Sequence, residues 1–146
     1  MQETLRILLA EDNPADAFLV QEALSLVNLS FHVTRAADGE KASQILDQIE
    51  RDKSVLDLIL LDLNLPKVSG HELLAKVRNG EHLCATPVII MTSSDSPQDR
   101  ARTAALQISY YFRKPTELTD FLQLGKIVKS VHHNFGRKPG EREADA

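Results

Sequence analysis

Several short apolar runs of this chain end in side chains that can handle a phosphoryl group and a divalent cation. These residues are an acidic pair, a single aspartate, a hydroxyl and a lysine: Glu11-Asp12, Asp62, Thr92 and Lys114. Carboxylates are costly in apolar surroundings unless they are paired or bind a cation. In an open α/β sheet, ligands bind outside the carboxyl ends of the strands. The sequence therefore predicts one polar site assembled from four strand ends.

The residue types at these strand ends favour phosphoryl chemistry that depends on a metal. The acidic pair and Asp62 repel one another when held close together, and Mg²⁺, which prefers carboxylates, waters and phosphate oxygens, relieves that repulsion. The backbone carbonyl of Asn64 is a further candidate ligand. Attack by Asp62 on phosphorus would give an aspartyl phosphate. Lys114 and the hydroxyl of Thr92 would then stabilise the new dianion.

Five strand-like runs alternate with helix-like segments. The runs are Leu5 to Ala10, Phe31 to Arg35, Leu56 to Leu61, Pro87 to Met91 and Ser109 to Arg113. Three of them are nearly continuously apolar, as in a parallel sheet covered on both faces, whereas Phe31 to Arg35 alternates and is expected near a sheet edge. The pattern predicts an α/β fold: a (βα)5 doubly wound, parallel five-stranded sheet.

Capping residues, prolines or glycines indicate where the first four helices start: Asn13-Pro14, Gly39, Gly70 and Ser96-Pro97. Thr116 is expected to cap a last helix that runs to about Asn134. This helix carries more apolar residues than one sheet face needs, and Gly125 would permit close approach of another backbone. The surplus is either a dimer surface or part of the core, and both interpretations stay open.

Composition sets the class of protein. With 146 residues, 26% of them charged and 42% hydrophobic, the chain is expected to form one ordinary globular domain. A net charge of -4 without a basic stripe argues against nucleic-acid binding. The apolar runs are too short to span a membrane, and no signal peptide is visible. The single cysteine, Cys84, excludes an internal disulfide and fits the cytoplasm.

The chain resembles the receiver domains of two-component response regulators over about residues 4–134. The matching motifs are Glu11-Asp12, Leu60 to Pro66 with Gly70, Pro87 to Ser93 and Lys114-Pro115. This resemblance implies a sheet order of 2-1-3-4-5. It also implies a Mg²⁺-dependent reaction in which Asp62 accepts a phosphoryl group from a histidine kinase.

The resemblance assigns further roles to single residues. Asp12 would bind Mg²⁺ directly and Glu11 through a water molecule. Thr92 would be the switch hydroxyl and Tyr111 the switch aromatic, although its neighbour Tyr110 competes for that role. The Lys114-Pro115 peptide is expected to be cis. Signalling would alter the face made by the fourth helix, fifth strand and fifth helix.

A narrower resemblance is to stand-alone receivers partnered with phytochrome-type histidine kinases. It is carried by the segment Glu11 to Asp16, the run from Asp62 to Pro66 and the tail past the fifth helix. Such receivers are often homodimers, here through the fifth helix and its neighbouring surface. Asp16 is expected to be a first-turn helix residue and not a metal ligand. Residues 135–146 are expected to form a mobile polar tail without an effector domain, so that output would be protein contact.

Three other functions remain as alternatives. They are an intermediate carrier in a phosphorelay, a constitutive protein-binding module with the same fold, and a phosphatase. Haloacid-dehalogenase-type phosphatases need an acid two residues after the nucleophile, where this chain has Asn64, so the chain is not expected to be an enzyme beyond its own phosphorylation and dephosphorylation. His71 is expected to face solvent, and no histidine has the setting of a phosphoryl donor.

Overall fold

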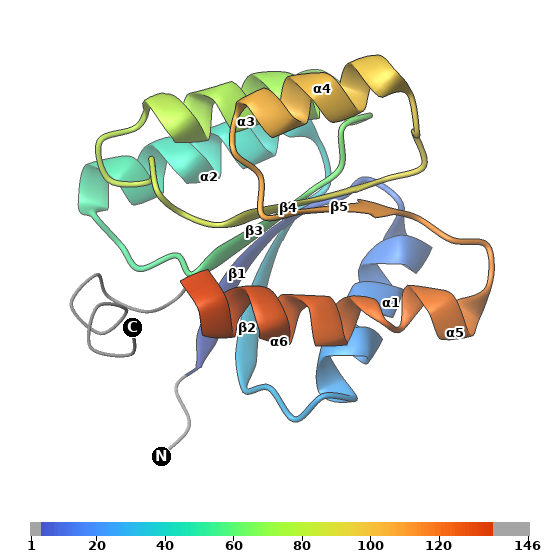
Figure 1. Cartoon of the computed structure of the whole chain (residues 1–146). Helices are drawn as coiled ribbons and strands as arrows, with labels where there is room; N and C mark the ends of the chain where they lie inside the picture. Colours follow the sequence, from blue (N-terminus) through green and yellow to red (C-terminus); the bar gives the residue numbers. More distant parts are fainter. Residues whose placement is uncertain (1–3, 136–146) are drawn as a thin grey trace.

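The computed structural model describes residues 4–135, which form one five-stranded parallel sheet between two layers of helices (Figure 1). The strands are β1 (Leu5–Ala10), β2 (Phe31–Ala36), β3 (Leu58–Leu61), β4 (Val88–Thr92) and β5 (Tyr110–Arg113). Their order is β2-β1-β3-β4-β5. The predicted fold class and strand order are confirmed, and the alternating run forms the edge strand β2.

The helices divide between the two faces of the sheet (Figure 1). They are α1 (Pro14–Ser25), α2 (Gly39–Asp52), α3 (Gly70–Asn79), α4 (Pro97–Ala105), α5 (Leu118–Phe121) and α6 (Leu124–Phe135). Successive strand residues face opposite sides, so Leu9 packs with the apolar residues of α1 and α6, while Leu8 packs with those of α2 and α3. Burying a leucine side chain contributes roughly 1.5–3 kcal/mol, and both cores hold the strand ends in place.

The strand register brings the predicted site together at one edge of the sheet. Ala10 pairs with Leu61, so the residues that follow β1 and β3 leave the sheet side by side. Thr92 pairs with Arg113, which places Lys114 one residue beyond the end of β5. The carboxyl ends of parallel strands thus meet as the sequence predicts.

Side-chain caps fix where the helices begin. The Asn13 side-chain oxygen accepts hydrogen bonds from the amides of Ala15 and Asp16, and Pro14 occupies the first turn of α1. Ser96 caps α4 in the same way, through the amide of Asp99. Such a cap stabilises a helix by about 1 kcal/mol. Both predicted Asn-Pro and Ser-Pro starts are confirmed.

The expected single last helix is wrong. The structure has a short helix, α5, followed by α6, and Glu117 rather than Thr116 precedes α5, without a side-chain cap. At the break, the amide of Gln123 donates to the carbonyl of Asp120 and that of Gly125 to Leu122. This three-residue spacing tightens the helix locally. Glycine also lowers helix propensity by about 1 kcal/mol relative to alanine, so the break falls where continuous helix is least favoured.

Gly125 lies against the backbone of α1. A Cβ atom at this position would be 2.2 Å from the Ala23 carbonyl oxygen, far inside any allowed contact. The expected close approach of another backbone is therefore present, and it occurs within the chain. The same seam buries much of the apolar surplus of the last two helices, including Phe121, Leu124 and Val128. For these side chains the core interpretation is confirmed.

Two boundaries stay predictions. The proposed receiver limits, 4–134, are not tested, and residues 136–146 of the predicted tail lie outside the described residues. Within residues 4–135, no helix has the length and apolar character that a membrane span requires.

Candidate functional site

Three carboxylates meet where β1 and β3 end. Glu11 is fully buried, Asp62 is 5% exposed, and Asp12 is exposed. One oxygen from each lies within 4.8 Å of the others. The amide of Asp62 donates to the carbonyl of Ala10, which holds β3 against β1 up to the site. The predicted acidic cluster therefore forms, with two of its charges removed from water.

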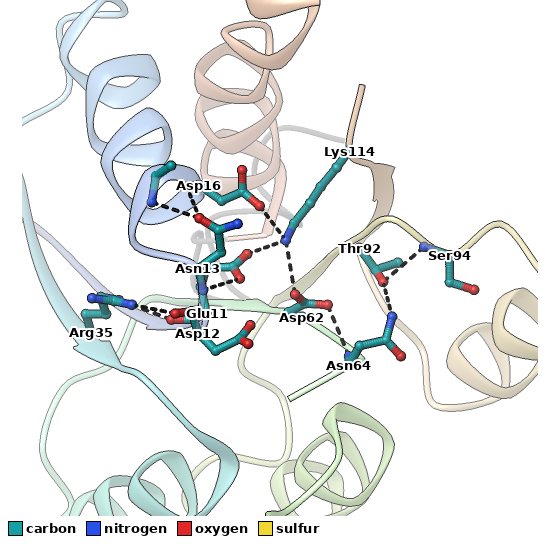
Figure 2. A network of polar contacts seen from close by, with 11 residues as sticks. Glu11, Asp12, Asn13, Asp16, Arg35, Asp62, Asn64, Thr92, Ser94 and Lys114 are labelled. Atoms are coloured by element: carbon teal, nitrogen blue, oxygen red, sulfur yellow. Dashed lines mark hydrogen bonds and ion pairs between the residues drawn. The ribbon is translucent and has the colours of Figure 1, made fainter. Parts of the chain in front are cut away.

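Lys114 supplies the positive charge of this cluster (Figure 2). Its side chain is 8% exposed, and its Nζ lies 2.5 Å from Glu11 Oε1, 2.9 Å from Asp16 Oδ2 and 3.0 Å from Asp62 Oδ2. An ammonium group has three donors; hydrogen bonds to Asp16 and Asp62 use two of them, and Glu11 Oε1 lies at ion-pair distance from the same nitrogen. Burial alone would lower the pKa of Lys114, but its hydrogen bonds to Glu11 and Asp16 and the charge of Asp62 outweigh that effect and raise it.

Glu11 is the most strongly desolvated carboxyl of the site. Burial raises its pKa from an ordinary 4.5 to about 7, although the Lys114 ammonium and a hydrogen bond from the Asn13 amide act in the opposite direction. A raised pKa means that the native state holds this proton more tightly than the unfolded chain does. The charge of Glu11 therefore costs folding free energy at neutral pH.

We expect a stability change with pH from this group. Between about pH 4.5 and pH 7 the unfolded chain loses the Glu11 proton before the native state does, so the free energy of unfolding should fall as pH rises through this window. Urea titrations of Mg²⁺-free protein at about pH 5 and about pH 7.5 measure the effect. Glu11→Gln is the control that should flatten this component of the profile. An unchanged slope in Glu11→Gln would assign the effect to other groups.

Thr92 and Asn64 form the other side of the site. Thr92 is fully buried, and its Oγ1 lies 3.4 Å from Asn64 Nδ2 and 3.3 Å from the amide of Ser94. The amide of Asn64 donates to Asp62 Oδ1 at 3.1 Å. Figure 2 shows these groups facing Asp62 from the side opposite Asp16. The predicted hydroxyl is thus linked to the candidate phosphoacceptor through Asn64.

Tyr111 and Tyr110 point to different sides of the sheet. The Tyr111 hydroxyl donates to the Ser94 carbonyl at 2.9 Å, and the Arg100 guanidinium lies 4.3 Å from its ring centroid. Tyr110 is 46% exposed and does not belong to the core that Tyr111 packs against. Because the Ser94 amide also donates to Thr92 Oγ1, the hydrogen bonds of Ser94 connect Tyr111 to Thr92.

The donor set fits a small, hard divalent cation. Clustered carboxylate oxygens are the ligands that Mg²⁺ takes in proteins, and Asp12 leaves one side of the cluster open to solvent waters. Asp62 has one oxygen toward Lys114 and the other toward the Asn64 amide. The cluster is compatible with Asp12 and Asp62 as ligands and with Glu11 acting through water. The Asn64 carbonyl as a further ligand stays a prediction.

Two sequence predictions near the site are wrong. The structure describes no cis peptide, so Lys114-Pro115 is trans, the isomer that an X–Pro bond favours by about 0.5–1 kcal/mol. His71 does not face solvent: its side chain is 11% exposed, and its Nε2 lies 2.8 Å from Asp99 Oδ1. Ser94 Oγ donates to the other oxygen of Asp99. These bonds to Ser94 and His71 lower the pKa of Asp99 and connect α3 and α4 to the segment after Thr92.

Sequence reasoning also missed Arg35, at the edge of the sheet. Its Nε donates to the backbone carbonyl of Glu11 and its Nη2 to that of Asp12, both at 3.1 Å (Figure 2). The guanidinium therefore fixes the loop that carries the acidic pair. Position on an alternating edge strand gave no signal for this role. Asp16 lies in the first turn of α1 as predicted, but its contact with Lys114 was not anticipated.

Comparison with known proteins gives a family match over most of the chain. Residues 7–125 match the response regulator receiver domain family. The probable methanogenesis regulatory protein FilR2 of Methanothrix harundinacea is 34% identical over 135 residues, covering 92% of this chain and 87% of FilR2. Response regulator Rcp1 of Synechocystis sp. is 36% identical over 126 residues, covering 85% of this chain and 86% of Rcp1.

Solved structures agree with the sequence comparison. The phosphorylated cyanobacterial phytochrome response regulator RcpA has a TM-score of 0.80 at 34% identity, covering 88% of this chain and 94% of the RcpA chain. The Mn²⁺-bound form of Rcp1 has a TM-score of 0.75 at 35% identity, covering 88% of this chain and 91% of that one. Both sequence and fold are therefore shared along nearly the whole length. The chain belongs to the response regulator receiver domain family.

Proposed function

We propose that this chain is a phosphorylation-driven switch whose phosphoacceptor is Asp62. The observation that carries the proposal is a buried aspartate in a cluster of three carboxylates, with one oxygen 3.0 Å from the ammonium of Lys114, whose side chain is 8% exposed. In the reaction, an Asp62 oxygen attacks the phosphorus of a phosphohistidine. A P–O bond forms, the P–N bond breaks, and the released imidazole nitrogen takes up a proton. Beyond its own phosphorylation and dephosphorylation, no enzymatic turnover is proposed.

The surrounding side chains divide the work of stabilising the phosphoryl group. Asp12, Asp62 and the Asn64 carbonyl would hold Mg²⁺, with Glu11 acting through water, and the cation supplies charge neutralisation for the incoming phosphate. Lys114 is within reach of Asp62 and would pair with phosphoryl oxygens. Thr92 would donate its hydroxyl from the opposite side.

Signal output is proposed to run from Thr92 to the face of α4, β5 and the last helices. Ser94 joins the two parts, because its amide donates to Thr92 Oγ1 and its carbonyl accepts from the Tyr111 hydroxyl. A shift of Thr92 toward the phosphoryl group would therefore disturb both bonds. A local charge change would in this way bias the packing of Tyr111.

The proposed phosphoryl donor is a histidine kinase in the cytoplasm, specifically one of the phytochrome type. Likeness to RcpA, a phytochrome response regulator, supports that choice. Homodimerisation is also proposed, through the surface of the last helices that stays exposed, since Phe121, Leu124 and Val128 are buried within the chain. Leu118, 55% exposed, remains an apolar residue of this region open to a partner.

Intact mass after incubation with acetyl phosphate tests the proposal. With Mg²⁺ we expect a gain of one phosphoryl group per chain, and with EDTA in place of Mg²⁺ we expect none, because four carboxylates would then face the incoming dianion with Lys114 as their counter-charge. Sizing chromatography of the same samples reports on dimerisation. Failure to gain mass together with failure to bind beryllofluoride, which needs no covalent lifetime, would support the constitutive binding module instead.

A further inference from the structure

Asp16 makes a contact that none of the assigned roles explains. It lies in the first turn of α1, and its Oδ2 accepts a hydrogen bond from Lys114 Nζ at 2.9 Å, across 98 residues of sequence. Its side chain is 24% exposed, so the pair is largely shielded from water. The Asn13 cap and Pro14 set the first turn of α1, and Figure 2 shows Asp16 turned toward the ammonium group.

This contact places Asp16 in competition with a phosphoryl group. Lys114 has three donors and three carboxylate partners, of which only Asp62 would carry the phosphoryl group. Three carboxylate oxygens already lie 2.5, 2.9 and 3.0 Å from Nζ, so an additional phosphoryl oxygen can come into contact with Lys114 only if one of them moves away. Glu11 is fully buried and has Lys114 as its cation, whereas Asp16 can turn to water. Asp16 is thus the partner that Lys114 releases at least cost.

The negative charge of Asp16, like its competition for Lys114, should weaken the binding of a phosphoryl group. It adds a fourth carboxylate to the cluster of Glu11, Asp12 and Asp62, with Lys114 as the cation that contacts three of them. An extra negative charge attracts a divalent cation and repels an incoming phosphate dianion. Removing it should therefore have opposite effects on the two ligands.

We propose that Asp16 is a positioning residue that restrains Lys114 and thereby limits how strongly the site binds a phosphoryl group. The proposal rests on the proposed function, since it concerns the same Asp62 site. It gives α1 a part in setting the balance between the unphosphorylated and phosphorylated states.

Titration calorimetry with two probes tests the proposal: Mg²⁺ alone, and beryllofluoride at saturating Mg²⁺. In Asp16→Asn we expect beryllofluoride to bind at least about threefold more tightly and Mg²⁺ to bind at least about twofold more weakly. Changes of this size correspond to the free energy of one partly exposed ion pair. Asp16→Glu, which keeps the charge and can reach Lys114, should restore wild-type values. A general loss of fold would weaken the binding of both ligands. An increase in beryllofluoride affinity together with a decrease in Mg²⁺ affinity therefore identifies the positioning role.

Glu22→Gln is the matched control, because Glu22 is an exposed acid on the same helix and its loss changes net charge by the same amount. It should leave both affinities within about twofold of wild type. Equal or weaker beryllofluoride binding by Asp16→Asn, or shifts of the same size in Glu22→Gln, would overturn the proposal. Asp16→Ser serves as a second variant if the asparagine form is unstable. Wild-type protein that fails to bind beryllofluoride would contradict the proposed function itself.

Discussion

Asp62→Asn should abolish phosphorylation completely while leaving the fold intact. The amide nitrogen cannot form the acyl phosphate, and no other carboxylate of the cluster combines burial with direct contact to Lys114 and the Asn64 amide. In Mg²⁺-free buffer the variant should also be more stable, by on the order of 1 kcal/mol, because one of several crowded charges is removed. Intact mass after acetyl phosphate treatment and a urea titration measure the two effects.

Asp47→Asn is the matched control for this variant. Asp47 is an acid of α2 that is half exposed and pairs with Lys76, away from the site. It should take up one phosphoryl group like the wild type. A phosphoryl adduct on Asp62→Asn would show that a residue other than Asp62 accepts the phosphoryl group. Equal or lower stability of Asp62→Asn without Mg²⁺ would show that the ion pair with Lys114 outweighs charge crowding.

Lys114→Ala should have the largest effect on stability. It leaves Glu11 fully buried without its cation, and breaking a buried ion pair in this way costs about 3–5 kcal/mol. The loss of stability should be greatest above about pH 7, where the Glu11 carboxyl would otherwise be charged. It should be smaller in acid, where the Glu11 carboxyl is protonated and neutral. Urea titrations at both pH values, with Lys126→Ala as an exposed-lysine control on α6, measure the effect.

The same variant tests the role of Lys114 in signalling. Some phosphorylation should remain, because Asp62 and the metal ligands are intact, but the response at the Tyr111 face should be lost. Dimerisation or kinase binding, compared before and after acetyl phosphate treatment, reports on that response. A full phosphorylation-dependent change in Lys114→Ala would show that Lys114 does not couple the two sites.

Much of the site was predictable because parallel strands all end at one edge of their sheet. Buried apolar runs identify the strands, and the polar residue after each run then marks a position in the crevice. Glu11, Asp62 and Lys114 converge for this reason, although up to about a hundred residues separate them in sequence. Asn13 and Ser96 were predictable from local rules, since each caps the helix that begins directly after it.

The remaining features depend on side-chain reach and helix packing, which no short motif records. Asp16 and His71 both stand at helix starts, where polar residues usually meet water, yet each finds a charged partner on a distant element. The role of Arg35 leaves no sequence signal, because its acceptors are backbone carbonyls, which any sequence provides. The need for glycine at position 125 comes from its contact with Ala23, a constraint set by the neighbouring helix.

The seam at Gly125 divides the molecule into parts of unequal stiffness. Along it, α1 and α6 meet backbone to backbone, so neither helix can slide without a collision. On the other face of the sheet, α3 and α4 are joined through a hydrogen bond between the side chains of His71 and Asp99, a contact that can lengthen without a backbone collision. If Asp62 is phosphorylated as proposed, the change at the face of α4, β5 and the last helices should therefore be accommodated mainly by α4 and Tyr111, while α6 stays fixed against α1.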